Sequence, residues 1–326
     1  MKLFGLDPQD ARDRMGSLGQ AVSIDNLIHD DGPERGARLI RLVSGGAFEM
    51  EVHPDRALDI GRVTYRGIPL AWSSPTGMSA PGLSEPLGDG WVRTWGGGLL
   101  TTIGLDSFGP SGQDGSEEFG THGRIGMQPA TLTRAEITHD SLHLEGEIRQ
   151  ATAFGDTLVM NRRITVPIGG SSLEIRDTVS NPGPETVEWM VLYHVNLGWP
   201  LLDAQTTIDI PGKASSGENE APFTIGQPSD DGKEIKNQYV LNEGQDSVTV
   251  DNPENGLKVQ LQYSPLTLPW LNTWRLTQKR RYVMAFEPSN TPSVAGRVEA
   301  RKTGDLPRLE PGESQTMKLR ITMSGH

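Results

Sequence analysis

The sequence predicts an all-β protein, built as a β-sandwich of one large domain. Short apolar runs that alternate with polar residues recur along its 326 residues, which is typical of strands with one buried face. The 39 glycines and 23 prolines are scattered between these runs without a fixed period, so they indicate many turns and exclude collagen and short repeats. No linker is evident. We therefore expect one domain over residues 1–326, with residues 1–35 as an N-terminal lead-in segment.

The first part of the chain predicts one helix, several strands and two loops. A short helix is expected over Pro8 to Leu18, although Gly16 weakens the pattern. Strands are expected at Ala37–Val43 and Phe48–Val52, with a hairpin turn at Ser44-Gly45-Gly46, and then as two short strands within Ala57–Trp72. The segment Trp95–Leu105 is glycine-rich and then apolar. Residues 73–89 and 107–120 are rich in Gly, Ser and Pro, and predict long loops of the kind that often carry function.

The second part predicts a nearly continuous series of strands. They are expected at Leu132–Ile137, Leu142–Ile148, Thr157–Val166, Leu173–Ser180, Val187–Asn196, Val248–Val250, Leu257–Tyr263, Trp270–Leu276, Tyr282–Phe286 and Met317–Met323. Turns are expected at 181–184 and 311–313. The polar stretch from Pro211 to about Val240 predicts loops.

The strand Val187–Asn196 is apolar on both faces. Its odd-numbered residues from Trp189 to Val195 point one way, whereas Met190, Leu192 and His194 point the other way. A strand of this kind is covered on both sides. We therefore expect His194 to lie inside the protein or on the floor of a cleft.

The composition excludes several classes of partner. Thirty Lys and Arg residues against 42 Asp and Glu residues give a net charge of −12, which argues against nucleic acid. The chain has no cysteine, so it has no disulfide, no thiolate nucleophile and no cysteine zinc site. No uncharged apolar stretch has the length of a membrane span or a signal peptide. We expect a cytoplasmic protein without a membrane partner.

Three distant segments each place one titratable side chain in a tight-turn or apolar run. They contain His122 (Gly-Thr-His-Gly-Arg), His194 (Leu-Tyr-His-Val-Asn-Leu) and Glu287 (Met-Ala-Phe-Glu-Pro). Each has an ordinary structural interpretation, as a loop cap, a core histidine and a turn residue respectively. Burying a charge is costly unless the charge is paired or used, so the three together favour acid/base chemistry.

These motifs, in this order, resemble the galactose mutarotase (aldose 1-epimerase) superfamily. The resemblance rests on the His-Gly turn at His122, on Asn181-Pro182-Gly183 leading to His194, and on Glu287 before Pro288, over roughly residues 36 to 323. The segments 54–61 and 70–75 resemble an uncharacterised aldose-1-epimerase-like subfamily. The chain departs from the family at 91–100, where the usual Asn-Arg segment is not visible. The resemblance implies a β-supersandwich fold.

The resemblance also implies roles for individual residues. Glu287 would be the base and His194 the acid of a ring-opening reaction on a small-molecule sugar, and His122 would hold a sugar hydroxyl. As further candidates for sugar binding, we expect Arg124, Arg56 and Arg93 to contact hydroxyls or an anionic group, and Trp95, like Trp72, to stack on the sugar. Asp59 is expected to pair with a nearby arginine. At least one of the three arginines is expected to reach the cleft.

Neither a metal nor an organic cofactor is expected. His139 and His143 lie four residues apart, but on a strand pair, where zinc spacing does not apply. Gly96-Gly97-Gly98 lacks the residues of a phosphate loop and does not fit the dinucleotide pattern. The sequence does not indicate an oligomeric state.

Three classes of function stay open at this point. The first is an isomerase that interconverts α and β anomers of a monosaccharide or sugar derivative. The second is a carbohydrate-binding protein without catalysis. The third is a lyase or glycoside-processing enzyme, which would need a carboxylate pair or a means to neutralise a substrate carboxylate.

Overall fold

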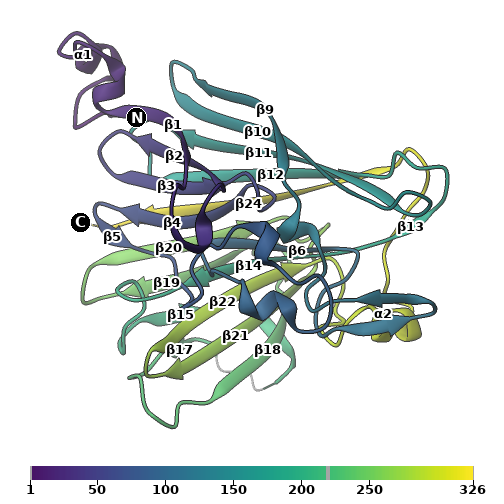
Figure 1. Ribbon diagram of the computed structural model, residues 1–326. Coiled ribbons are helices and arrows are strands. Elements are labelled where there is room, and N and C mark those ends of the chain that lie inside the picture. Colours follow the sequence, from purple (N-terminus) through teal and green to yellow (C-terminus); the bar gives the residue numbers. More distant parts are fainter. Residues whose placement is uncertain (1, 218–220, 326) are drawn as a thin grey trace.

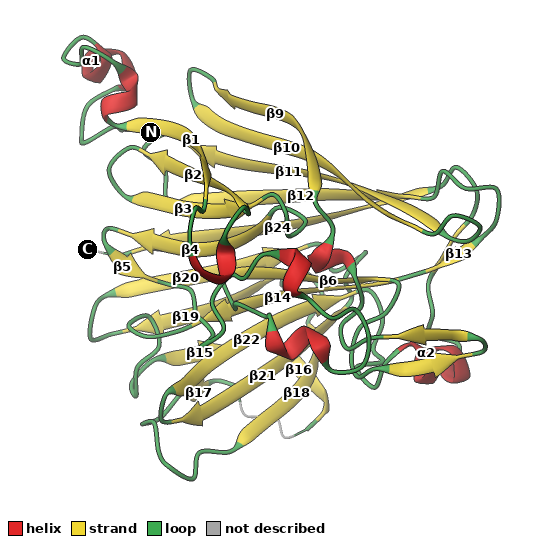
Figure 2. Ribbon diagram, in the orientation of Figure 1, coloured by secondary structure: helices red, strands yellow, loops and turns green. Residues whose placement is uncertain are grey.

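Two large antiparallel sheets form the protein, as the alternation of apolar residues predicts. A computed structural model describes residues 2–217 and 221–325 (Figure 1). Strands dominate, and the few helical segments lie before the first strand or in connections between strands (Figure 2). Buried side chains of both sheets form one continuous core, so the sheets pack as a sandwich. The prediction of an all-β sandwich is confirmed.

The first sheet has eleven strands and carries the candidate site described below. Its strand order is β1-β2-β3-β4-β6-β14-β22-β21-β18-β16, with β5 paired to β4. The bounds are β1 Val22–Ile28, β2 Arg38–Ser44, β3 Phe48–His53, β4 Asp59–Tyr65, β5 Ile68–Pro69, β6 Leu100–Leu105, β14 Met190–Leu197, β16 Gly212–Ser216, β18 Glu234–Leu241, β21 Trp270–Gln278 and β22 Arg281–Ser289.

The second sheet has nine strands in the order β17-β15-β19-β20-β24-β12-β11-β10-β9. The bounds are β9 Ala130–Ile137, β10 Ser141–Ala151, β11 Thr157–Pro167, β12 Ser172–Ser180, β15 Thr207–Asp209, β17 Phe223–Thr224, β19 Ser247–Asn252, β20 Leu257–Tyr263 and β24 Ser314–Ser324. Regular alternation of buried and exposed residues along β10, β11 and β12 explains why the sequence predicted this region well.

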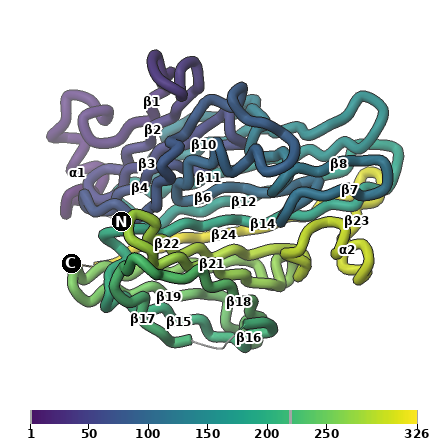
Figure 3. The backbone as a smooth tube through the Cα atoms, turned by 60° about the horizontal axis from the view of Figure 1, so that its bottom comes forward, coloured from purple at the N-terminus to yellow at the C-terminus, as the bar shows by residue number. Residues whose placement is uncertain are grey.

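Short elements complete the chain. Two small sheets pair β7 Gly112–Asp114 with β8 Glu117–Phe119, and β13 Val187–Glu188 with β23 Arg308–Leu309. The helices are α1 Pro8–Arg12 and α2 Arg297–Thr303, with 3-10 turns η1 Leu18–Gln20, η2 Gly32–Glu34, η3 Pro81–Leu83, η4 Gly90–Arg93 and η5 Ile125–Met127. The hairpin β7–β8 lies beside α2 at the end of the sandwich away from the two chain ends (Figure 3).

The two faces of β14 separate as predicted. Val191, Tyr193 and Val195 lie in the main core, whereas Met190 and Leu192 belong to a second apolar cluster with Trp91, Ile103 and Phe108. The face that carries His194 is therefore the outer face of the eleven-stranded sheet, covered by loops rather than by the other sheet.

A buried ionic network fixes the inner face of the same strand. Arg162 on β11 donates to both carboxylate oxygens of Asp177 on β12 (2.9 and 2.6 Å), and Tyr193 donates its hydroxyl to Asp177 at 2.7 Å. Arg162 also reaches Asp59 on β4 at 3.2 Å and the Thr102 hydroxyl on β6 at 2.8 Å. The expected arginine partner of Asp59 thus comes from a distant strand in the opposite sheet.

Several boundaries differ from the sequence-based expectation. The α-helix ends at Arg12, and the 3-10 turn η1 follows after Gly16, because glycine is a poor helix residue. The predicted lead-in segment contains β1, an edge strand whose outer half is exposed and so lacks an apolar pattern. Within the loop predicted at 107–120 the chain forms the hairpin β7–β8, and the helix α2 was not predicted.

The prediction of loops from Pro211 to Val240 is wrong. The stretch contains β16, β17 and β18, and residues 218–220 lie outside the described part of the chain. Strand β18 pairs with β21 over six residues from Glu234 to Tyr239. The polar side chains of β18 face a cavity rather than the core. A polar stretch can therefore form a strand here.

Candidate active site

The three predicted motifs meet at one cavity. His122, His194 and Glu287 all line a cavity of about 610 Å³ on the outer face of the eleven-stranded sheet. His194 comes from β14 and Glu287 from β22, which are neighbours in the sheet, and His122 comes from the loop that precedes η5. The expectation that His194 and Glu287 share one cleft agrees with this arrangement. The expected gap of several ångströms, with room for a sugar ring between the two side chains, is wrong, because their polar atoms lie only 3.2 Å apart.

The register of β14 and β22 explains how His194 and Glu287 approach. Leu192 pairs with Ser289 and Val195 with Phe286, which sets His194 directly opposite Glu287. Residues opposite each other in an antiparallel pair place their side chains side by side on one face. Accordingly, Nε2 of His194 lies 3.2 Å from Oε1 of Glu287.

Burial shifts both members of this pair toward their neutral forms. The side chains of His194 and Glu287 are 7% and 12% exposed. Burial raises the pKa of Glu287 to about 7, and the charge of Lys236 opposes this rise. Burial lowers the pKa of His194 to about 4. Between these values the neutral acid and the neutral imidazole are the stable forms, with one proton held by the pair.

A backbone hydrogen bond orients the ring of His122, and the ring is neutral and can donate a hydrogen bond. Its Nδ1 accepts the backbone N–H of Gly109 at 3.3 Å, which leaves the ring proton on Nε2. Burial lowers the pKa of His122 to about 3, with His194 and Lys236 adding to the effect. The residue has a positive φ of 63°, and a Cβ on the following Gly123 would lie 2.3 Å from the Ser107 carbonyl oxygen. The turn thus requires glycine at position 123.

An aromatic wall borders the histidines. Trp91 stacks on Trp95 with ring centroids 4.7 Å apart, and Trp91 also contacts His122 at 4.4 Å. The His194 ring lies 5.0 Å from Trp95 and 6.0 Å from Trp274. Trp91, Trp95 and Trp274 line the cavity, whereas Trp72 packs behind Trp95 at 5.3 Å. Flat apolar surfaces of this kind suit the C–H face of a sugar ring.

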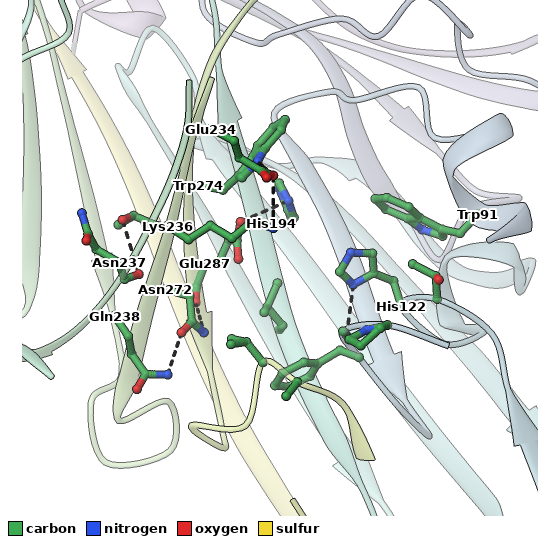
Figure 4. A pocket seen from close by; sticks show the side chains of 18 of the residues that line it. Trp91, His122, His194, Glu234, Lys236, Asn237, Gln238, Asn272, Trp274 and Glu287 are labelled. Carbon is green, nitrogen blue, oxygen red and sulfur yellow. Dashed lines mark hydrogen bonds and ion pairs between the residues drawn. The ribbon is translucent and has the colours of Figure 1, made fainter. Parts of the chain in front are cut away.

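A polar wall from β18 and β21 stands opposite His122 and Trp91 (Figure 4). Glu234 accepts the indole N–H of Trp274 at 2.6 Å and pairs with Lys236 at 3.1 Å. Deeper in the wall, Gln238 donates to Asn272 at 2.8 Å, and Asn272 donates to the Ser289 hydroxyl at 3.1 Å. The amides therefore brace β22 next to Glu287.

The sequence named neither Trp91 and Trp274 nor the residues of β18 as site residues. Only the tryptophans carried a usable signal, because both lie in segments that border predicted site motifs. The polar residues of β18 carried none, since a polar stretch without apolar alternation is typical of a loop.

The three arginines predicted to bind substrate lie elsewhere. Arg56 donates to the Ser79 carbonyl oxygen at 3.0 and 2.5 Å, and Arg124 pairs with Asp106 at 2.7 Å. Arg93 forms an exposed ion pair with Glu85. None of them is among the described residues that line the cavity, so the expectation that an arginine reaches the cleft is not met. Each is bound by a carboxylate or a carbonyl of a loop outside the cavity lining, which sequence spacing does not reveal.

Two further features concern ligands and membranes. Over residues 2–217 and 221–325, no group of three or more His, Asp or Glu side chains is placed to hold a metal ion. Over the same residues, no helix has the length and apolar character needed to cross a membrane.

Solved structures of galactose mutarotase-like proteins and of candidate aldose 1-epimerases share this two-sheet sandwich fold. A candidate aldose 1-epimerase from Klebsiella pneumoniae superposes with a TM-score of 0.84 at 21% identity, covering 93% of this chain and 83% of the other. A galactose mutarotase-like protein from Clostridium acetobutylicum gives 0.68 at 13% identity, covering 94% and 100%. Galactose 1-epimerase from Lactobacillus acidophilus NCFM gives 0.63 at 12% identity, covering 94% and 100%.

The family follows from the sequence itself. The model described as Domain of unknown function (DUF4432) matches residues 34–323, so the chain belongs to this family. No curated protein matches the chain. The match includes all three motifs and the polar strand β18.

Proposed function

We propose that the protein is an isomerase that interconverts the α and β anomers of a monosaccharide or sugar derivative by acid/base ring opening. The observation that carries this proposal is the 3.2 Å link between Nε2 of His194 and Oε1 of Glu287 in a cavity about 610 Å³ in volume. Ring opening needs a base at the anomeric hydroxyl and an acid at the ring oxygen, two atoms bonded to one carbon. Two side chains at this separation can serve both atoms of one bound sugar.

The reaction uses the one proton that the pair holds. In the tautomer with an ionised Glu287 and a protonated His194, Glu287 takes the proton of the anomeric hydroxyl. The bond from the anomeric carbon to the ring oxygen breaks, and His194 Nε2 protonates that oxygen. Rotation about the next C–C bond turns the open-chain carbonyl over. The reverse steps close the ring on the other face: His194 takes the proton back from the ring oxygen, and Glu287 returns its proton to the anomeric oxygen.

The walls of the cavity support a role in binding the sugar. The neutral His122 offers its Nε2–H to a hydroxyl, and Trp95 and Trp91 offer apolar surface to the ring. Lys236 is the one cationic side chain among the described lining residues, and it is paired with Glu234. With the arginines engaged elsewhere, these features favour a neutral sugar over a uronate.

A screen of anomeric exchange tests the proposal. Hexoses, pentoses, ketoses and uronic acids are each mixed with the protein, and the rate of α–β exchange is measured by NMR. We expect acceleration with at least one neutral sugar. Tight binding without faster exchange would instead identify a carbohydrate-binding protein, and cleavage or elimination products would identify a lyase or hydrolase.

A further inference from the structure

Asn196 lies two residues beyond His194 on β14, which places both side chains on one face of the strand. The residue is completely buried. Its Nδ2 donates to the carbonyl oxygens of Gly98 and His194, each at 3.0 Å. These two bonds use both protons of the amide and fix which way it points. The amide therefore presents its oxygen, and not its nitrogen, to the remaining neighbours.

Two buried polar atoms on this face of β14 are not hydrogen-bonded within the described part of the chain. Among the described residues, neither Oδ1 of Asn196 nor Nδ1 of His194 has a hydrogen-bond partner. One is an acceptor and the other can be a donor, and residues i and i+2 on one strand face are about 7 Å apart along the chain, within reach of two side chains. Leaving both unpaired would cost about 1–3 kcal/mol for each group. A hydrogen bond between the two atoms would remove that cost.

We propose that Asn196 is a positioning residue whose Oδ1 accepts the Nδ1–H of His194 and thereby fixes the ring tautomer. The inference deepens the proposed function and rests on it for its catalytic meaning. With Nδ1 permanently protonated, Nε2 is the only ring atom that exchanges a proton with Glu287 or the sugar. The neutral ring then carries a lone pair on Nε2, so the 3.2 Å link to Glu287 is made by the carboxyl proton.

The electrostatics agree with this arrangement. Burial lowers the pKa of His194, and a hydrogen bond donated by the ring to Asn196 would oppose that lowering. In the opposite tautomer, Nδ1 would place a lone pair next to the Asn196 oxygen, and two acceptors would repel each other. Asn196 thus selects the tautomer in which the histidine can accept a proton only toward the substrate.

The tautomer can be observed directly in the full-length protein without any substrate. Histidine labelled with ¹⁵N reports on each ring nitrogen through its coupling to the ring C–H protons. We expect the neutral His194 to show a protonated Nδ1 and an unprotonated Nε2. A neutral ring protonated at Nε2 in the wild-type protein would overturn the inference, whatever the protein turns over.

Two substitutions separate positioning from general damage. Asn196→Asp keeps the acceptor and adds a charge, so the tautomer should persist and the pKa of His194 should rise by at least one unit. Asn196→Leu removes the acceptor, so the proton should move to Nε2. With an active sugar, kcat should then fall by about tenfold while KM stays within about twofold, the loss expected for one buried hydrogen bond.

A matched control is Asn252→Leu. Asn252 is also buried, and its Nδ2 also donates to two carbonyl oxygens, those of Pro200 and Leu201, but it does not line the cavity. This variant should lose stability without a change in the His194 tautomer or in kcat. If Asn196→Leu does not fold, the wild-type tautomer and the pKa in Asn196→Asp decide the matter. An unchanged His194 pKa in Asn196→Asp would contradict the inference.

Discussion

Nε2 of His194 and Oε1 of Glu287 lie 3.2 Å apart because β14 and β22 pair in a register that sets the two residues opposite each other. Both side chains are almost fully buried, and burial favours the neutral form of each. The pair therefore holds one proton over a range of pH. This property distinguishes it from a surface ion pair, in which both groups would be charged at neutral pH.

The rate of anomeric exchange should have a bell-shaped dependence on pH. Below about 4 both groups carry a proton, so no base is present, and above about 7 neither does, so no acid is present. Around the pair, His122 is neutral across this window, and Lys236 and Glu234 face it as an ion pair. A profile of kcat/KM from pH 3 to 9 with a non-ionising sugar measures this. A flat profile between pH 4 and 9 would exclude the pair as the acid and base.

The two histidines of the cavity should respond differently to substitution. His194→Asn removes a proton-transfer group and should mainly lower kcat, by roughly 10²-fold or more. His122→Asn removes a hydrogen-bond donor and should mainly raise KM, by roughly tenfold. Steady-state kinetics on the same sugar compares them. Equal loss of kcat in both variants would mean that His122 takes part in proton transfer.

Glu287→Gln should stabilise the protein at alkaline pH. Burial raises the pKa of Glu287 from 4.5 to about 7, so its contribution to stability is present below pH 4.5 and is lost as pH rises through 7. The loss amounts to about 3 kcal/mol at pH 8, and glutamine avoids it. The melting temperature of the variant relative to wild type should rise by roughly 5 °C between pH 4.5 and 8. A difference that stays constant with pH would show that the carboxyl does not titrate abnormally.

Uronic acids should be poorer substrates than the corresponding neutral sugars, and the arginines should not change this preference. Arg93 pairs with Glu85 in an exposed position, and Arg56 is bound to Ser79, both outside the lining of the cavity. Arg93→Ala should keep kcat/KM for the neutral sugar within about threefold, since an exposed ion pair contributes little. Arg56→Ala should do the same, because Arg56 does not line the cavity. Exchange measured on a matched hexose and uronate gives the ratio. Loss of uronate turnover on removal of either arginine would place an anionic group in the site.

Most of the strands could be predicted from the sequence because apolar and polar residues alternate along them. The strands β10, β11, β12 and β24 alternate buried and exposed residues, so their position and facing followed from apolar spacing alone. Strand β18 lacks this apolar alternation, because Glu234, Lys236 and Gln238 face the cavity and the intervening Asn237 is polar as well. Its polar residues line the cavity, and a polar stretch of this kind predicts a loop when only the sequence is known.

The site was predicted in part for a similar reason. His194 stood out as the one histidine of an apolar strand, and the ordered motifs linked it to His122 and Glu287. The arginines could not be placed, because their partners Ser79, Glu85 and Asp106 depend on how the loops fold. Asn196 could not be recognised either. Its proposed role depends on the folded structure, in which Nδ2 donates to the carbonyl oxygens of Gly98 and His194 and leaves Oδ1 free to accept.

The most direct test of the central claim compares wild type with Glu287→Gln in two-dimensional exchange NMR of an equilibrated sugar. Cross peaks between the α and β anomeric protons report interconversion with no change in the overall equilibrium. We predict strong cross peaks with wild-type protein and a rate at least roughly 10²-fold lower with Glu287→Gln, because glutamine keeps the shape of the side chain but accepts no proton at neutral pH. Asn252→Leu, remote from the cavity, should retain the wild-type rate. Equal rates for wild type and Glu287→Gln on a proven substrate would contradict the assignment of Glu287 and His194 as the acid and base.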